Sequence, residues 1–80
     1  MPRYFLHVQD RTEFTEDPEG AEFDNLGSAI EEAKASAREL MAERLEAGGP
    51  LGLKRSIVIA DEHGDTLAKV PFSDALPPEE

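Results

Sequence analysis

The side chains best suited to chemistry in this chain are two histidines and a run of carboxylates. His7 falls in an apolar segment and His63 in a polar one, and neither has a second ligand at a metal-binding spacing such as His-x-x-x-His. We therefore expect no metal site. His7 is interpreted as a half-exposed strand residue, and His63 as a loop residue.

The carboxylates gather between residues 10 and 20, where Glu13, Glu16, Asp17 and Glu19 could loosely bind a hard cation. This segment lacks the alternating acidic positions and the closing glutamate of an EF-hand, so we interpret it as solvated charge. Carboxylates that act as a catalytic acid and base need a pocket that separates their pKa values. A domain this small offers little concavity for one.

Nucleophiles and phosphate-binding loops are also missing from the sequence. There is no cysteine, and no serine lies in a Gly-x-Ser-x-Gly motif. The segment Gly48-Gly49-Pro50-Leu51-Gly52 follows an expected helix and lacks the Gly-Lys-Ser/Thr of a phosphate-binding loop. These observations predict a protein that is not an enzyme and that uses no cofactor.

The length of the chain, 80 residues, is enough for one hydrophobic core and too short for two. We predict a single domain over residues 1–73, followed by a mobile acidic and proline-rich tail at 74–80. A chain of this size buries only about 60–65% of its unfolded surface, so an interface that hides more apolar surface would stabilise it.

Charge and hydropathy narrow the classes of partner. Eighteen acidic and eight basic residues give a net charge of −10, which repels nucleic-acid backbones. The charge serves solubility or, alternatively, forms an acidic face for a basic partner protein. The apolar run at residues 4–8 is too short for a signal peptide or a membrane span, and we expect a cytoplasmic protein.

Two strands are expected before the helix. Residues 3–9 are rich in aromatic and β-branched types, and their alternation assigns Tyr4, Leu6 and Val8 to the core. Residues 10–20 contain the turn signal Asp-Pro-Glu-Gly and are expected to form a hairpin loop. A short return strand at 21–23 would direct Ala21 and Phe23 inward.

The apolar spacing changes to a helical period over residues 26–47. One stripe contains Leu26, Ile30, Ala33, Ala37, Leu40, Met41 and Leu45. Asn25 is the expected N-cap, although Ser28 and Glu31 form an alternative capping box one turn later. Two glycines and a proline end the helix. This helix is longer than any strand here, so one end carrying Leu45 must overhang the sheet.

A second hairpin is expected after the helix, with strands at 54–60 and 66–72. Ile57 and Ile59 are predicted to face the core from the first strand, and Ala68, Val70 and Phe72 from the second. Pro71 cannot donate a hydrogen bond, which indicates an edge strand or a strand end.

These elements predict an α+β fold of two layers in the order β-β-α-β-β, in which a four-stranded antiparallel sheet is covered on one face by a single long helix. The opposite face would carry Phe5, His7, Val58 and Leu67, which become contiguous if the first and third strands are neighbours. Together with Leu45, these residues are the candidate interface.

Three segments support a family resemblance: Arg3-Tyr4-Phe5-Leu6-His7-Val8, Asp17-Pro18-Glu19-Gly20 and Val70-Pro71-Phe72. With the alanine-rich helix between them, they resemble a family of short uncharacterised bacterial proteins that opens with an Arg-Tyr-Phe-Phe-His-Val strand. The chain departs from that pattern at Leu6 and at Asp10-Arg11. The resemblance implies the one-domain layout and no activity. The strand pair and helix also resemble the N-terminal domain of HicB-type antitoxins, whose DNA-binding tail is missing here.

Three functions follow as hypotheses. The first is a non-enzymatic interaction module, a homodimer that buries the open sheet face or the helix overhang. The second is an antitoxin-like acidic protein that neutralises a basic toxin or an RNA-handling enzyme. The third is a small-ligand binder or enzyme that uses His7 and the acidic loop. None of the three involves direct contact with nucleic acid or with a membrane.

Overall fold

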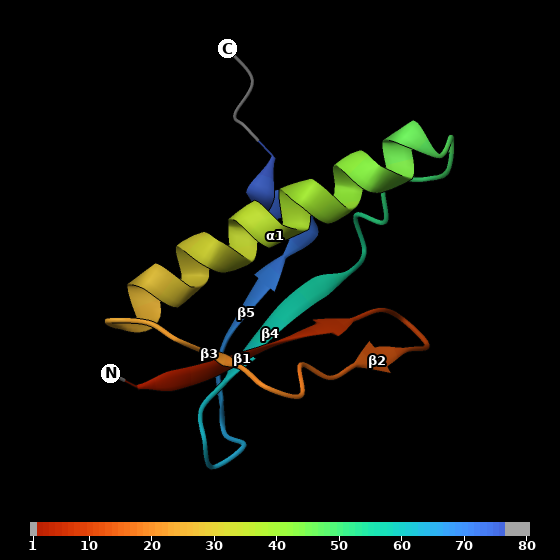
Figure 1. Ribbon diagram of the computed structural model, residues 1–80. Coiled ribbons are helices and arrows are strands. Elements are labelled where there is room, and N and C mark those ends of the chain that lie inside the picture. The colour runs from red at the N-terminus through yellow and green to blue at the C-terminus, as the bar shows by residue number, and fades with distance from the viewer. Residues whose placement is uncertain (1, 77–80) are drawn as a thin grey trace.

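The computed structural model of the protein describes residues 2–76, which form one long helix packed on an antiparallel sheet (Figure 1). In chain order the elements are the strands β1 (Arg3–Gln9), β2 (Phe14–Thr15) and β3 (Ala21–Glu22), the helix α1 (Leu26–Glu46), the strands β4 (Ser56–Ala60) and β5 (Thr66–Pro71), and the 3-10 helix η1 (Phe72–Ala75). The predicted α+β class and element order are confirmed. The short strand β2 is an addition inside the expected loop.

The sheet has the strand order β2-β1-β4-β5, and β3 pairs with the same edge of β1 as β2 does. β1 and β4 are antiparallel neighbours over five residue pairs, from Phe5 opposite Ala60 to Gln9 opposite Ser56. The first and third strands of the predicted order are therefore adjacent. β5 lies at the other edge, which is the position that Pro71 indicated.

The boundaries of α1 are set by the caps that the sequence offered. Asn25 is extended, and its side-chain oxygen accepts a hydrogen bond from the Ser28 N–H at 2.9 Å. The helix therefore starts at Leu26, and the alternative start at Ser28 is wrong. At the other end Gly48 has φ 80°, and the Gly49 N–H donates to the Arg44 carbonyl, which completes a Schellman motif.

Small side chains form the centre of the contact between α1 and the sheet. Ala29, Ala33 and Ala37 have no exposed surface, and Met41 is also buried. They pack with the core residues of β4, β5 and η1, namely Ile57, Ile59, Val70, Phe72 and Ala75. The predicted stripe is thus shifted: Leu26, Ile30 and Leu40 lie half-buried at its margin, and Ala29, absent from the prediction, lies at its centre.

Leu45 does not belong to the core, in contrast to its place in the predicted stripe. It is 67% exposed, and residues 42–46 are all exposed. The reason is length, since 21 helical residues extend for about 31 Å and the five residues of β4 for only about 17 Å. The last turns of α1 project beyond the strand that the helix covers.

The second hairpin is shorter at its start than the sequence predicted, because Lys54 and Arg55 lie in the turn that precedes β4. The Arg55 side chain is buried, with its guanidinium carbon 4.4 Å from the centre of the Phe72 ring. Its Nε and Nη2 atoms donate to the carbonyls of Gly52 and Leu51. Gly52 has φ 76°, a conformation that favours glycine, and a Cβ there would displace the Arg55 guanidinium, whose Nε would lie only 2.5 Å away.

The chain continues past the predicted domain end. Phe72 leaves the strand and starts η1, whose Ala75 is buried against α1. Asp74 and Ala75, expected to begin a mobile tail, are therefore part of the fold. Leu76 is the C-cap of η1, and residues 77–80, the rest of the predicted tail, lie outside the described residues. Another correction concerns Ala21, which was expected to point inward and is exposed, while Phe23 packs near Tyr4.

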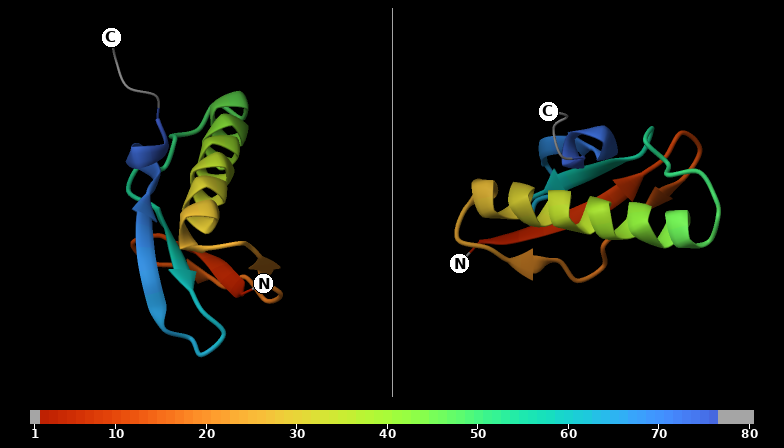
Figure 2. Two further views of the ribbon diagram at one scale, coloured as in Figure 1. Left: turned by 90° about the vertical axis from the view of Figure 1, so that its left-hand side faces the viewer. Right: turned by 90° about the horizontal axis from the view of Figure 1, so that it is seen from above.

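Figure 2 shows α1 along one side of the sheet and η1 at the end of β5, and the two helices are in contact. No helix of residues 2–76 lies on the other side of the sheet, which we call the open face. α1 carries too little apolar length to span a bilayer, and η1 is far shorter.

The Phe72 ring is expected to contribute more to stability than any exposed aromatic side chain. Phe72→Ala removes a fully buried ring from beneath Arg55 and should lower the free energy of unfolding by about 3–5 kcal/mol. Phe14→Ala, the same change at an exposed ring, should cost less than about 1 kcal/mol. Urea denaturation followed by circular dichroism measures both. Equal losses in the two variants would contradict this description of the core.

Candidate functional site

Three of the predicted interface residues lie together on the open face. His7 and Val58 are opposite each other in the β1–β4 register, and Phe5 is opposite Ala60. Leu67 lies one strand farther, on β5, at a register shift beside Ala60, and it is exposed. The sheet therefore brings Phe5, His7 and Val58 together and places Leu67 next to them.

Val58 was expected to be exposed, and this prediction is wrong. It is only 8% exposed, because β4 is an inner strand and Val58 has His7 opposite on one neighbour and Lys69 on the other. Phe5 and His7 are half-buried as well. The open face is consequently less apolar at its surface than the sequence pattern indicated.

Leu45 lies in the other layer, near the C-terminal end of α1, and does not join the residues of the open face. It borders a separate apolar groove of about 200 Å³, which we call the helix groove. Its lining residues are Arg38, Met41, Ala42, Leu45, Leu51 and Leu76. The predicted interface set thus divides into two surfaces.

His7 and part of the acidic loop line one hollow of about 430 Å³ on the open face, which we call the acidic hollow. Phe5, His7, Pro18 and Ala60 contribute to it, together with the four acidic residues Glu16, Asp17, Asp61 and Glu62. Glu13 and Glu19, also proposed from sequence, are not among its lining residues. Such a hollow favours cationic groups over anions.

Asp17 attaches the loop before β3 to the middle of β1. Its Oδ2 accepts a hydrogen bond from the Leu6 N–H at 3.2 Å. Its Oδ1 accepts from the backbone N–H groups of Glu19 and Gly20 at 3.3 and 3.1 Å. β2 and β3 pair with the two ends of the outer edge of β1, so the carboxylate occupies the place between them that a strand would otherwise fill.

His7 is held by the same loop. The Asp17 N–H donates to His7 Nδ1 at 3.0 Å, so the neutral ring carries its proton on Nε2. The ring lies in a row between Phe5 and Phe14, with centroid distances of 6.3 and 5.2 Å. These contacts explain the half-burial of His7 by packing and by hydrogen bonding of the loop.

The ionisation of Asp17 reflects two opposing effects. Burial raises the pKa of this carboxyl, whereas the hydrogen bonds from the backbone N–H groups of Gly20, Leu6 and Glu19, together with a smaller effect of His7, lower it by more. The pKa of Asp17 therefore lies below its ordinary value. The charged form is the one that fastens the loop.

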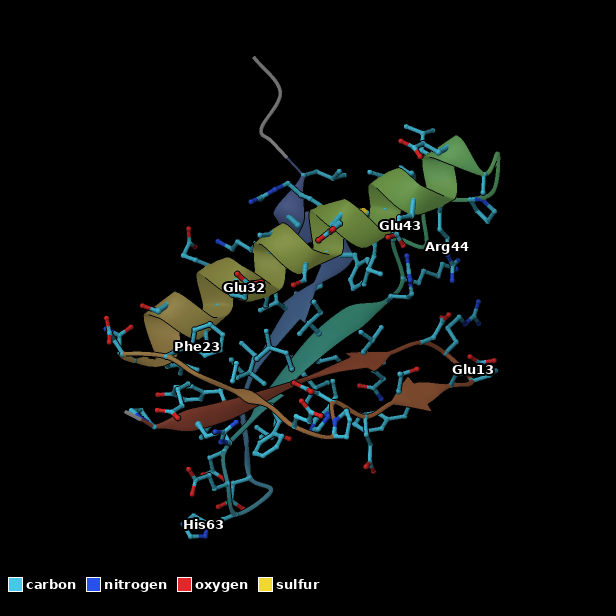
Figure 3. All side chains as sticks on the ribbon, viewed as in Figure 1. Glu13, Phe23, Glu32, Glu43, Arg44 and His63 are labelled. Atoms are coloured by element: carbon cyan, nitrogen blue, oxygen red, sulfur yellow. The ribbon has the colours of Figure 1, made fainter. Side chains whose placement is uncertain are left out.

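His63 lies at the tip of the β4–β5 turn, far from α1 (Figure 3). Its backbone N–H donates to Asp61 Oδ1, and its side chain is exposed. Within residues 2–76 no three His, Asp or Glu side chains gather as metal ligands would. The interpretation of His63 as a loop residue agrees with this placement.

Sequence reasoning did not single out Asp17 among the carboxylates. A local signal was available, because an aspartate before Pro-x-Gly commonly accepts hydrogen bonds from the N–H groups two and three residues later. The bond from Leu6 depends on the pairing of distant segments, and no local pattern indicates it.

Removing the charge of Asp17 should destabilise the protein. In Asp17→Asn an amide replaces a carboxylate that accepts three backbone hydrogen bonds, and we expect a loss of about 1–2 kcal/mol in the free energy of unfolding at neutral pH. Glu16→Gln is the matched control at an exposed neighbour and should cost less than about 0.5 kcal/mol. Equal effects in the two variants would show that the loop is not fastened through Asp17.

The destabilisation caused by Asp17→Asn should depend on pH. Because the folded-state pKa of Asp17 is lowered, its stabilisation is fully present above its ordinary value of 3.8 and is lost as pH falls through the lowered value. The difference in stability between the natural protein and Asp17→Asn should therefore be constant from about pH 6 to about pH 5 and should narrow from there to about pH 2.5. Urea denaturation across this range measures it, and a constant difference would contradict the lowered pKa.

Comparison with known proteins gives a family without an activity. No curated protein and no solved structure is significantly similar to this chain. The resemblance to HicB-type antitoxins therefore stays a prediction. Residues 3–73 match the sequence profile of a domain of unknown function, DUF6894. This match covers both hairpins and the helix, and the chain belongs to the DUF6894 family.

Proposed function

We propose that this protein is a non-enzymatic interaction module that forms a homodimer through the helix groove. The observation that carries the proposal is the exposure of two leucines at an apolar groove, with Leu45 67% and Leu76 42% exposed. Met41, Ala42 and Leu51 line the same groove. Leucines that border a groove in this way are typical of surfaces that another molecule covers.

A small domain benefits from such a contact. At this length only about 60–65% of the unfolded surface is buried on folding, so the core by itself supplies limited stability. Burial of the Leu45 and Leu76 side chains against a second copy would increase the apolar surface removed from water. It would also make the stability of the protein depend on its concentration.

Charge complementarity favours a second copy as the occupant. Arg38, Ala42 and Leu45 share one side of α1, since they are spaced four and three residues apart. If two helices cross antiparallel about a two-fold axis at Ala42, residue i of one faces residue 84 − i of the other. Arg38 then faces the partner's Glu46, and the symmetry forms this ion pair twice.

The same arrangement is sterically suitable. Ala42 at the crossing point has the small side chain that allows two helices to approach closely. By the same relation the partner's Leu45 lies level with Glu39, between Arg38 and Met41 of the groove. A two-fold contact of this kind is closed, so association ends at the dimer.

Sedimentation equilibrium of the full chain tests the proposal. We expect a dimer at micromolar concentration and at least about tenfold weaker association in Leu45→Glu, since a buried carboxylate would replace an apolar contact. Leu67→Glu, the same change on the open face, should leave association unchanged. A monomer at all concentrations, or a dimer disrupted only by Leu67→Glu, would overturn the proposal.

Charge reversal tests the geometry. Arg38→Glu and Glu46→Arg should each weaken the dimer, and the double variant should restore it, because the two charges are exchanged across the two-fold axis. Circular dichroism confirms that each variant is folded. Additive weakening in the double variant would contradict the antiparallel arrangement about Ala42.

A further inference from the structure

A second hollow, of about 480 Å³, lies where the end of α1 meets the turn after β1 and the segment before β4. Its rim carries three cations, Arg11, Arg44 and Lys54, and one carboxylate, Asp10. Pro50, Leu51 and Leu53 supply an apolar lining. We call it the basic hollow. Figure 3 shows Arg44 on the side of α1 that faces this segment.

The concentration of positive charge here is unusual for this protein. Arg11, Arg44 and Lys54, with the adjacent Arg55, make up four of the eight basic residues in a chain whose net charge is −10. The ion pairs within 4.0 Å among residues 2–76 are Arg3–Glu22 and Lys34–Glu31, so none of the four belongs to one.

The excess of positive charge destabilises the protein because Arg55 is buried. It is only 7% exposed, and its hydrogen bonds go to the carbonyls of Leu51 and Gly52, which are neutral acceptors. A buried guanidinium without a carboxylate partner is destabilising unless a negative charge lies nearby. Burial, followed by the charge of Arg44, lowers the pKa of Arg55, and Asp10 opposes this effect.

We propose that the basic hollow binds a small organic anion, in which a carboxylate or phosphate group contacts Arg11, Arg44 and Lys54 and an apolar body lies on Pro50, Leu51 and Leu53. The volume is within the range of small-molecule sites, about 300–1,000 Å³. Arginine side chains hold such groups by paired hydrogen bonds, and lysine adds a point charge. The anion also compensates the charge of Arg55.

The carbonyl end of α1 does not oppose this binding strongly. The carbonyls of Glu43, Arg44 and Leu45 accept hydrogen bonds from the backbone N–H groups of Ala47, Gly49 and Gly48. The negative end of the helix dipole is therefore partly satisfied by the chain itself. Asp10 is the one carboxylate in the lining, against three cations.

A titration with three probes tests both halves of the proposal. The probes are 2-naphthoate, 2-naphthol and inorganic phosphate, added to ¹⁵N-labelled full-length protein and followed by amide chemical shifts. We expect 2-naphthoate to bind at least about tenfold more tightly than either of the others, with shifts centred on residues 50–55. If 2-naphthol bound as tightly as 2-naphthoate, the proposed role of the cations would be overturned. If phosphate bound as tightly as 2-naphthoate, the proposed role of the apolar lining would be overturned.

Two double variants that lose the same charge distinguish binding at this site from an effect of the protein's overall charge. Arg44→Gln with Lys54→Gln should weaken 2-naphthoate binding by about tenfold, because two rim cations are lost. Lys34→Gln with Lys69→Gln removes the same charge from other surfaces and should change binding by less than about twofold. Similar weakening in both pairs would overturn the site.

The same titration with hexaglutamate distinguishes a small ligand from an acidic protein segment. Weaker binding of the peptide than of 2-naphthoate supports the small ligand, and tighter binding would overturn it in favour of a protein partner. Dimer dissociation by Leu45→Glu leaves the three rim cations in place, so 2-naphthoate binding in that variant reports on this site independently of self-association.

Discussion

Three alanines, Ala29, Ala33 and Ala37, form the contact through which α1 packs on the sheet, and all three are fully buried. Side chains this short bring the helix close to Ile57 and Ile59 on the inner strand, so one helix is enough to close the core. The same contact has a consequence at the end of the helix. A helix held against a strand of about half its length must project beyond it, and residues 42–46 at its end are exposed.

The charges of the molecule are separated along β4. Arg55 precedes this strand and directly follows Lys54 of the basic hollow, whereas Asp61 and Glu62 come after the strand and line the acidic hollow. The net charge of −10 is therefore unevenly distributed, and surfaces of opposite charge lie at the two ends of one inner strand. Surfaces of opposite charge favour partners of opposite charge. The apolar helix groove lies apart from the acidic hollow, and Leu51 is the one lining residue that it shares with the basic hollow.

The sequence predicted the elements that depend on neighbouring residues and missed those that depend on distant ones. The Asn25 cap and the Gly48 stop are local, and they set α1 to within one residue of its predicted end. The burial of Val58 required knowledge that β4 lies inside the sheet, and the role of Asp17 required the position of Leu6. Leu45 was predicted both as a core residue and as part of the projecting end of the helix. It lies in the projecting end, because the strands are too short to reach it.

The proposed dimer requires that a second copy of the chain covers the projecting end of α1. The most direct measurement is an isotope-filtered nuclear Overhauser experiment on an equal mixture of ¹³C-labelled and unlabelled protein. A dimer formed through the helix groove predicts intermolecular contacts from the Leu45 methyl groups to the methyl groups of Met41 and Leu76. Intermolecular contacts confined to Leu67 on the open face, or none at a concentration where the protein is dimeric, would contradict it.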